Sequence, residues 1–325
     1  DVKTEDLSEG FTILNTKKLP YREEGAQQYL NDHNVHFSDL SDMVSNSDII
    51  FVPIQTPHDP QYEGTTRLPE ERVDFDYTWL EQGIKSLSEE IDKQKEDKII
   101  VIISTVLPGT INNKIKPLLN SYMKLCYNPF FIAMGTTISD FLHPEFVLFG
   151  VDDDYAASEA EKFYTTIHDK PFFRCTVEEA EMIKVSYNTY ITMKICLANT
   201  VMEMSHKLNN INCDNVMAGL GLANERLISK KYLRGGMGDG GGCHPRDNIA
   251  LSWLAGEVVL SYDWYDNLML CREKQTEWLA DLIAEEKDKG ALPVVILGKC
   301  FKKETNLTVG SPSILLRNIL EERGV

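Results

Sequence analysis

Three apolar runs along the chain are continuous, with no alternation between apolar and polar positions. They cover residues 49–54, 99–103 and 293–297. Continuous runs rich in β-branched residues are typical of strands that are buried on both faces of a parallel sheet. Shorter apolar stretches at 123–127 and 146–149 predict further strands. The pattern therefore predicts an α/β fold in which helices cover both faces of the sheet.

Segments with helical spacing of apolar residues lie between these runs. Residues 77–94 carry apolar side chains three and four positions apart, which predicts an amphipathic helix between the first two strands. Strand, helix and strand in this order form the unit of a Rossmann-like, doubly wound parallel sheet. A longer helix is predicted over 178–208, where Gly and Pro are absent and apolar residues occupy more than one side. We expect that helix to be buried between domains.

The last third of the chain predicts a helical region and, after it, a second α/β unit. A helical region over 247–289 is broken around Gly256 and Tyr262, and a helix starting near Ser311 follows the last apolar run. The run and that helix begin a second α/β unit. We therefore expect three domains, which are a Rossmann-like domain over 1–175, a central helical domain over 176–289 and the start of another α/β domain over 290–325.

Both ends of the sequence look cut. A dinucleotide-binding sheet opens with a strand and a glycine-rich turn of the G-x-G-x-x-G kind, and no such turn stands near Asp1. The first forty residues instead predict a helix-rich connection followed by a strand. The chain ends at Val325, one strand and one helix into its last unit. We expect a piece that lacks the opening strand and turn and most of the last domain.

Charge and cysteine content narrow the class of partner. The chain has 33 Lys and Arg against 50 Asp and Glu, a net charge of -17, which disfavours binding to nucleic acid or to anionic membranes. No apolar run is long enough to span a bilayer and no signal peptide opens the chain, so we expect a cytoplasmic protein. The seven cysteines are scattered and never spaced as CxxC, so neither a disulfide framework nor a metal site is expected.

The strongest chemical signal is a glycine-rich loop that leads into Cys243. Six glycines occur within residues 235–242, and Pro245 and Asp247 then open a helix. Glycines let backbone approach a ligand closely, and a cysteine near a helix N-terminus has a lowered thiol pKa. These properties fit a nucleophile. A flexible surface loop followed by a core cysteine explains the same spacing equally well.

A second candidate pair lies on the long predicted helix. Lys184 and Asn188 are four positions apart and therefore share a helix face. An amine and an amide on one face of a buried helix can bind an oxyanion. Taken alone, a solvated lysine with a neighbour one turn away is the favoured explanation.

Small polar residues follow the first two predicted strands. Thr56 and Pro57 come after the first strand, and Ser104 and Thr105 come after the second. Ligands of open α/β sheets bind beyond the carboxyl ends of the strands, so these residues are candidates for cofactor or substrate contact. Each is equally well explained as a turn residue or a helix cap.

Taken in order, these segments resemble the UDP-glucose/GDP-mannose dehydrogenase family. The resemblance covers essentially the whole chain, and although any one motif is weak, their shared order and spacing are specific. The matching motifs are Thr56-Pro57, Ser104-Thr105-Val106 with Gly109-Thr110, Asn128-Pro129, Ala180-Glu181-Met182-Ile183-Lys184 with Asn188, the glycine loop into Cys243 with Asp247, Leu297-Gly298, and Phe301-Lys302-Lys303.

The resemblance implies an NAD-dependent enzyme that oxidises C6 of a nucleotide-linked hexose twice. It implies that Cys243 attacks the intermediate aldehyde and forms a thiohemiacetal, which is oxidised to a thioester and then hydrolysed. Lys184 would stabilise oxyanions, and Asp247 would orient or activate water with Asn188 nearby. Thr105 would hold a water at the strand end.

The resemblance also implies binding residues and an assembly. Asp1 is similar to the acidic residue that holds the cofactor ribose, beside Thr56, Pro57, Ser104 and Thr105. The substrate would be UDP-glucose, GDP-mannose or a relative, and a homodimer would form on the long central helix. Residues similar to those that meet the nucleotide sugar, besides Lys184 and Asn188, are Arg226, which would reach a neighbouring subunit, Arg234, Gly240 and Lys302.

The chain departs from the family pattern at several positions. Phe130 and Met134 stand where the family has glutamates, the first of which assists thioester hydrolysis. Arg246 replaces a lysine, and Leu307 and Val309 replace an aspartate and an arginine that support the substrate or a domain contact. Water activation and sugar specificity are therefore open. His244 is interpreted as a cap or surface residue, since neighbouring helix residues point apart.

Three other functions compete with full oxidation to the carboxylate. The missing glutamates suggest a silent nucleotide-sugar-binding protein, or a dehydrogenase that stops at the aldehyde. A general 3-hydroxyacid dehydrogenase of similar architecture would not need Cys243. The presence of Cys243, Lys184, Asn188 and Asp247 together argues against a silent protein.

Overall fold

The computed structural model describes two compact units, residues 1–191 and 192–325, and the boundary between them falls inside one long helix. The three-domain division expected from the sequence stays a prediction. The described residues are 23–32, 36–57, 73–133, 135–228, 237, 245, 252, 254–290, 293–300, 308 and 310–325.

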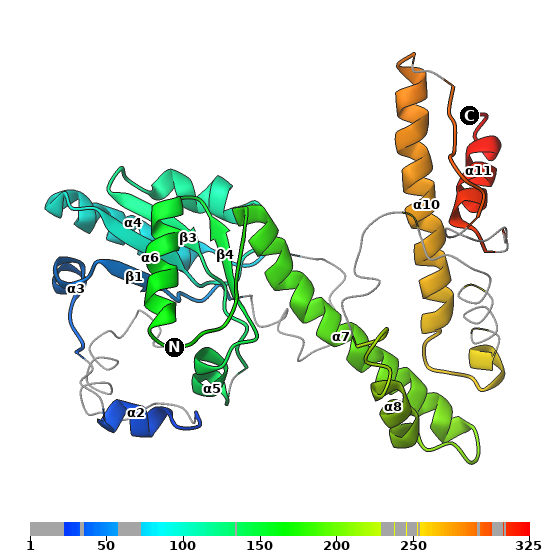
Figure 1. Cartoon of the computed structure of the whole chain (residues 1–325), viewed down its shortest axis with the longest axis horizontal. Coiled ribbons are helices and arrows are strands. Elements are labelled where there is room, and N and C mark those ends of the chain that lie inside the picture. The colour runs from blue at the N-terminus through cyan, green and yellow to red at the C-terminus, as the bar shows by residue number, and fades with distance from the viewer. Residues whose placement is uncertain are drawn as a thin grey trace. The chain divides into compact units, whose positions relative to one another are not determined.

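A five-stranded sheet forms the centre of the first unit (Figure 1). The strands are β1 (Ile49–Val52), β2 (Lys98–Ile102), β3 (Met123–Tyr127), β4 (Val147–Val151) and β5 (Phe172–Cys175), and they lie in this order across the sheet. The first three strands are parallel, with Ile50 opposite Ile100 and Ile102 opposite Tyr127. The α/β fold and the first four predicted strands are confirmed.

The sheet is mixed rather than wholly parallel, because β4 runs antiparallel to β3. The connection between them contains one short helix, α5 (Thr137–Leu142). In an antiparallel pair the chain leaves one strand and enters the next at the same edge of the sheet, so no helix has to carry it back along the strands. β5 then pairs parallel to β4.

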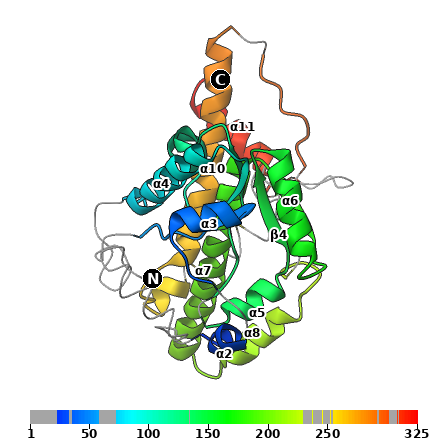
Figure 2. The same ribbon diagram turned by 90° about the vertical axis from the view of Figure 1, so that its left-hand side faces the viewer.

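Alternate residues of the central strands enter two separate cores. On one face, Ile100 and Ile102 pack with the apolar stripe of α4 (Thr78–Gln94). On the other face, Ile99 and Val101 pack with α6 (Asp154–Thr165). Figure 2 shows α4 and α6 on opposite sides of the sheet. This burial on both faces is the reason that β2 is a continuous apolar run.

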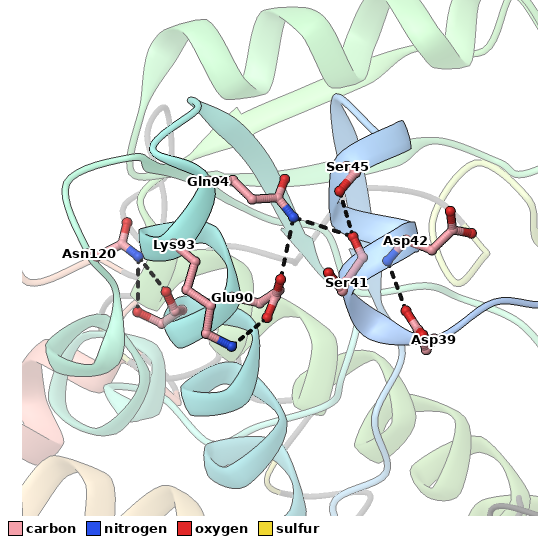
Figure 3. A network of polar contacts seen from close by, with 9 residues as sticks. Asp39, Ser41, Asp42, Ser45, Glu90, Lys93, Gln94 and Asn120 are labelled. Carbon is pink, nitrogen blue, oxygen red and sulfur yellow. Dashed lines mark hydrogen bonds and ion pairs between the residues drawn. The ribbon is translucent and has the colours of Figure 1, made fainter.

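Helix α3 (Leu40–Asn46) is fastened to α4 by polar contacts (Figure 3). Asp39 accepts a hydrogen bond from the backbone N–H of Asp42 (2.9 Å) and so caps the helix start. Gln94 Nε2, at the end of α4, donates to the carbonyl of Ser41 (3.3 Å). The contacts fix α3 beside the amino end of β1.

Several elements of this unit carry no clear sequence signal. Helix α2 (Ala26–Asp32) precedes α3, and β2 is followed by a π-helical turn, η3 (Ile111–Ile115), and a 3₁₀ turn, η4 (Lys116–Leu118). Helix α6 buries small residues, which give a weak periodic pattern. These residues are Ala156, Ala157 and Ala160.

The predicted long helix is α7 (Val177–Lys207). The second unit adds α8 (Cys213–Gly221), α10 (Trp264–Asp288) and α11 (Pro312–Glu322). α10 and α11 pack through Ala280, Leu316, Ile319 and Leu320. The predicted break around Gly256 and Tyr262 and the helix start near Ser311 are confirmed. None of the helices within the described ranges combines the length and apolarity that crossing a membrane requires.

The strand predicted over 293–297 is wrong. Residues 293–298 are irregular, and Leu297 is 91 % exposed. A strand needs a neighbour to complete its ladder of hydrogen bonds, and the described part of this unit supplies none. The apolar run therefore has the composition of a strand, but among the described residues it has no neighbouring strand with which to pair.

Candidate active site

The carboxyl ends of β1 and β2 meet at one edge of the sheet, because these strands are parallel. The loops that follow them line an open hollow of about 310 Å³. Residues expected from the sequence at these strand ends all line it. The lining residues are Pro53, Ile54, Gln55, Thr56, Pro57, Ser104 and Thr105.

Two hydroxyl groups join these loops. Thr56 Oγ1 donates to the carbonyl of Thr105 (2.6 Å), and Ser104 Oγ donates to the carbonyl of Ile54 (2.5 Å). The side chains thus hold the two loops together around the hollow. Their small size leaves the backbone of both loops open to a ligand.

Lys184 lies on the second turn of α7 and is buried, with 7 % of its surface exposed. Its Nζ donates to the carbonyl of Phe130 (2.7 Å), in the loop after β3, and lies 5.1 Å from the centre of the Phe131 ring. Burial lowers the pKa of Lys184. The solvated lysine favoured on spacing alone is wrong, because α7 turns this face onto the carboxyl end of β3.

Asn128 begins the loop that Lys184 contacts. Its Oδ1 accepts from the hydroxyl of Tyr164 (2.5 Å), and its Nδ2 donates to the carbonyl of Leu148 (2.9 Å). The amide is 1 % exposed and bridges β4 and α6. It therefore sets where Phe130 and its carbonyl lie.

Phe130 packs among aromatic rings. The resemblance leads us to expect a carboxylate at this position. The Phe130 ring lies 5.6 Å from that of Phe141, and Phe141 lies 6.0 Å from Tyr164. The side chain belongs to the core on the α6 face of the sheet. This surrounding is apolar.

Two side chains to which the sequence assigned no role also lie near the carboxyl ends of the strands. Glu181, one turn before Lys184 on α7, accepts from the backbone N–H groups of Gly109 and Ile111. The hydroxyl of Tyr77 accepts from the N–H of Leu107 (3.2 Å). Glu181 falls inside a recognised motif, but its partners lie 70 residues or more away in sequence and no local pattern reveals them.

Other predicted residues lie elsewhere or outside the described residues. Asn188 is exposed, one turn beyond Lys184. Arg226 is exposed in the turn after α8, in the second unit. Predictions for the residues outside the described ranges stay predictions, and these are Asp1, Met134, Arg234, Gly240, Cys243, Asp247 and Lys302.

Two described cysteines of the first unit have thiols of low reactivity. Burial raises the pKa of Cys126 to about 12 and that of Cys175 to about 11. Both thiols stay protonated near neutral pH, and a protonated thiol is a poor nucleophile. Neither Cys126 nor Cys175 is therefore a candidate for the nucleophile.

Two family models match most of the chain. Residues 7–168 match the NAD-binding domain of the UDP-glucose/GDP-mannose dehydrogenase family. Residues 178–269 match the central domain of the same family. The first match contains the hollow between the β1 and β2 loops, and the second contains Lys184.

Individual relatives agree with the family models. The chain is 27 % identical to the GDP-mannose 6-dehydrogenase of Pseudomonas aeruginosa, over 96 % of this chain and 71 % of the relative. It is 26 % identical to the UDP-glucose 6-dehydrogenase of Rickettsia conorii, over 96 % of this chain and 70 % of the relative.

Solved structures show the same likeness. The chain superposes on GDP-mannose dehydrogenase from Pseudomonas aeruginosa, determined as a ternary complex, with a TM-score of 0.88 and 26 % identity. That match covers all of this chain and 73 % of the other. A UDP-glucose dehydrogenase from Pyrobaculum islandicum shares the fold, with a TM-score of 0.59, 22 % identity, and coverage of 100 % and 73 %.

Proposed function

Because the chain belongs to the UDP-glucose/GDP-mannose dehydrogenase family, we propose that it oxidises the C6 primary alcohol of a nucleotide sugar to a carboxylate. The cofactor is NAD, which the matched domain binds. When bound, NAD supplies the hydride acceptor for such an oxidation. The substrate we propose is UDP-glucose, GDP-mannose or a related nucleotide sugar.

We propose that the hollow at the ends of β1 and β2 is part of the dinucleotide site. It lies beyond the carboxyl ends of parallel strands, where open α/β sheets bind ligands. Small side chains at Thr56, Ser104 and Thr105 let a cofactor approach the backbone. We propose that these residues and Pro57 contact NAD, and that Asp1 holds its ribose.

The buried amine of Lys184 is the observation that carries the proposed chemistry. The amine lies at the loop after β3, where it meets a carbonyl and an aromatic face. A cation in an apolar setting stabilises an oxyanion more strongly than it does in water. We propose that Lys184 stabilises the negative charge that develops on the C6 oxygen.

Cys243 is the proposed nucleophile. Loss of a hydride from C6 and of the proton from its hydroxyl group gives the aldehyde, and the Cys243 thiolate adds to the carbonyl carbon, with protonation of its oxygen, to form a thiohemiacetal. Loss of a second hydride leaves a thioester. Water then attacks the thioester carbon, so that the carboxylate leaves and the thiol is restored. Asp247, with Asn188 and Thr105, would orient that water.

Binding of the substrate and assembly complete the proposal. Arg226, Arg234, Gly240 and Lys302 would contact the nucleotide sugar, and the basic ones would supply local positive charge in a protein of net charge -17. Two copies would pair through α7. The cytoplasmic location remains a prediction.

Product stoichiometry tests the proposal. The protein is incubated with NAD and, in separate reactions, with each candidate nucleotide sugar. Two NADH per sugar consumed is the expected result. Cys243→Ser should abolish carboxylate formation while leaving NAD affinity unchanged. Carboxylate made by the serine variant would exclude the covalent mechanism.

Arrest at the aldehyde is the second candidate, and Phe130 favours it. An aromatic side chain packed against Phe141 cannot activate the water that cleaves a thioester. Without that step the thioester on Cys243 would not turn over, and release of the aldehyde before the second hydride loss would be the remaining route to a free product. One NADH per sugar, with aldehyde trapped by a hydrazine reagent, would support arrest. No NADH at all, with nucleotide sugar bound, would identify a silent binding protein.

A further inference from the structure

A buried carboxylate on α7 is left without a role by the chemistry proposed above. Glu181 is 0 % exposed. Its Oε2 accepts from the N–H of Gly109 (2.6 Å) and its Oε1 accepts from the N–H of Ile111 (2.8 Å). Both donors lie where the loop after β2 turns into η3. One side chain therefore joins α7 to the loop that carries Ser104 and Thr105.

The same loop is also held by a residue that precedes α4. The hydroxyl of Tyr77, just before α4, accepts from the N–H of Leu107 and from Thr110 Oγ1, each at 3.2 Å. It donates in turn to Asp74 Oδ1 (2.7 Å). Hydrogen bonds from Tyr77 and Glu181 thus hold residues 107–111 between α4 and α7.

A carboxylate suits these two donors for a geometric reason. Gly109 has a φ of +90°, a conformation that glycine adopts readily and that aims its N–H toward α7 beside that of Ile111. Adjacent N–H groups at the start of a helical turn carry partial positive charge, and a carboxylate accepts from both at once.

The carboxylate lies next to an apolar core. That core contains Val177 and Ala180, from the same helix, and Tyr127, whose pKa is raised by burial and by the charge of Glu181. Burial raises the pKa of Glu181, while the bonds from Ile111 and Gly109 oppose that rise. An apolar residue at this position would pack without the desolvation cost of a charge. We therefore attribute the carboxylate to its effect on the loop, whose conformation it fixes.

Lys184 lies on the same helix, three positions after Glu181. The first side chain fixes the loop after β2, and the second contacts the loop after β3. Rotation or sliding of α7 would move both loops together. The separation between the two loops is therefore set by one rigid turn of helix.

We propose that Glu181 is a positioning residue that holds residues 104–111 in the conformation that binds the cofactor, in fixed register with Lys184. It acts through the backbone of Gly109 and Ile111 and touches neither substrate nor cofactor. The effect on KM for NAD rests on the proposed function, whereas the anchoring of the loop does not.

The test uses Glu181→Gln in the full chain. Glutamine keeps the size of the side chain but offers one acceptor oxygen, so one of the two N–H groups faces an amide N–H₂. We expect amide hydrogen exchange at Gly109 and Ile111 to speed up about tenfold or more, the factor for losing one charge-assisted hydrogen bond. We expect KM for NAD to rise by about as much, with KM for the nucleotide sugar little changed.

Glu178→Gln is the matched control. Glu178 is exposed on the same turn of α7, and its Oε1 accepts from Asn112 Nδ2 (2.5 Å), a bond that glutamine retains. Exchange and KM should stay at wild-type values. Glu181→Asp keeps the charge on a shorter arm, so it should recover part of the NAD affinity that Glu181→Gln loses.

Tyr77→Phe covers the case in which Glu181→Gln does not fold. It removes the other anchor with little change of volume and should raise KM for NAD several-fold, with faster exchange at Leu107. The proposal is overturned if exchange at Gly109 and Ile111 is unchanged in a folded Glu181→Gln variant, or if exchange speeds up while KM for NAD stays constant. A wild-type chain without turnover would contradict the proposed function, and exchange would still decide whether Glu181 anchors the loop.

Discussion

Burial gives the side chain of Lys184 an environment that few lysines have. Its amine donates to the carbonyl of Phe130 and faces the ring of Phe131, and burial lowers its pKa. A carbonyl and a ring face both favour the cation, whereas loss of water disfavours it. The amine is thus a cation that gives up its proton at a lower pH than an ordinary lysine.

The pH dependence of activity should reveal this lowered pKa. If the cation of Lys184 stabilises the C6 oxyanion, kcat should fall as pH rises through the lowered pKa, at a lower pH than that at which ordinary lysines lose their proton. Lys184→Arg should move this fall in kcat to higher pH, because the guanidinium stays charged. Initial rates of NADH formation between pH 6 and about 10.5 measure the pH at which kcat falls.

Lys184→Met should lower kcat on the order of a hundredfold, the usual effect of removing one oxyanion donor. Lys194→Met, an exposed position on the same helix, is the control and should leave kcat within about twofold. An unchanged kcat in Lys184→Met would remove the amine from the proposed chemistry.

Helix α6 covers one face of the sheet, and an N-cap residue stabilises its first turn. Asp153 precedes the helix, and its carboxylate accepts from the N–H of Ala156 (2.9 Å). The helix then packs Ala157, Ala160 and Tyr164 against the sheet. Because Tyr164 also donates to Asn128, a loosened α6 would disturb the loop after β3.

We expect Asp153→Ala to lower the free energy of unfolding by about 1 kcal/mol, the typical cost of a lost N-cap. Asp153→Asn should recover most of that loss, since its side-chain oxygen can accept the same bond. Urea unfolding followed by circular dichroism measures both variants. Equal stability of Asp153→Ala and wild type would show that the first turn of α6 does not depend on this cap.

The molecule as a whole leaves apolar side chains exposed along α7. They occur at intervals over most of the helix, and they are Met182, Tyr190, Ile191, Met193 and Met202. Exposed apolar surface of this kind on one helix suits contact with another copy of the chain. The proposed homodimer would bury it.

Sedimentation velocity tests this assembly. The wild-type chain should sediment as a dimer, and Met193→Glu should shift it to a monomer, because a charge would be buried at the helix pair. Tyr155→Glu, at an exposed aromatic residue of α6, is the control and should remain dimeric. A wild-type monomer at all concentrations would contradict the proposed homodimer.

Local pattern was sufficient to predict much of the fold. β1 to β3, α4 and α7 follow from apolar runs and helical spacing, because each depends on neighbours in sequence. β5 and α6 gave weak signals, since β5 is only partly buried and α6 buries alanines. The run at 293–297 shows the limit of the method, because strand composition does not provide a pairing partner.

The sequence alone was enough to place the chain in its family and to single out Lys184, Thr56 and Thr105, because those signals are motifs of adjacent residues. The direction of β4, the burial of Lys184 and the partners of Glu181 required the folded chain. Each depends on contacts between residues far apart in sequence, and such contacts exist only after the strands have paired and α7 has packed against their ends.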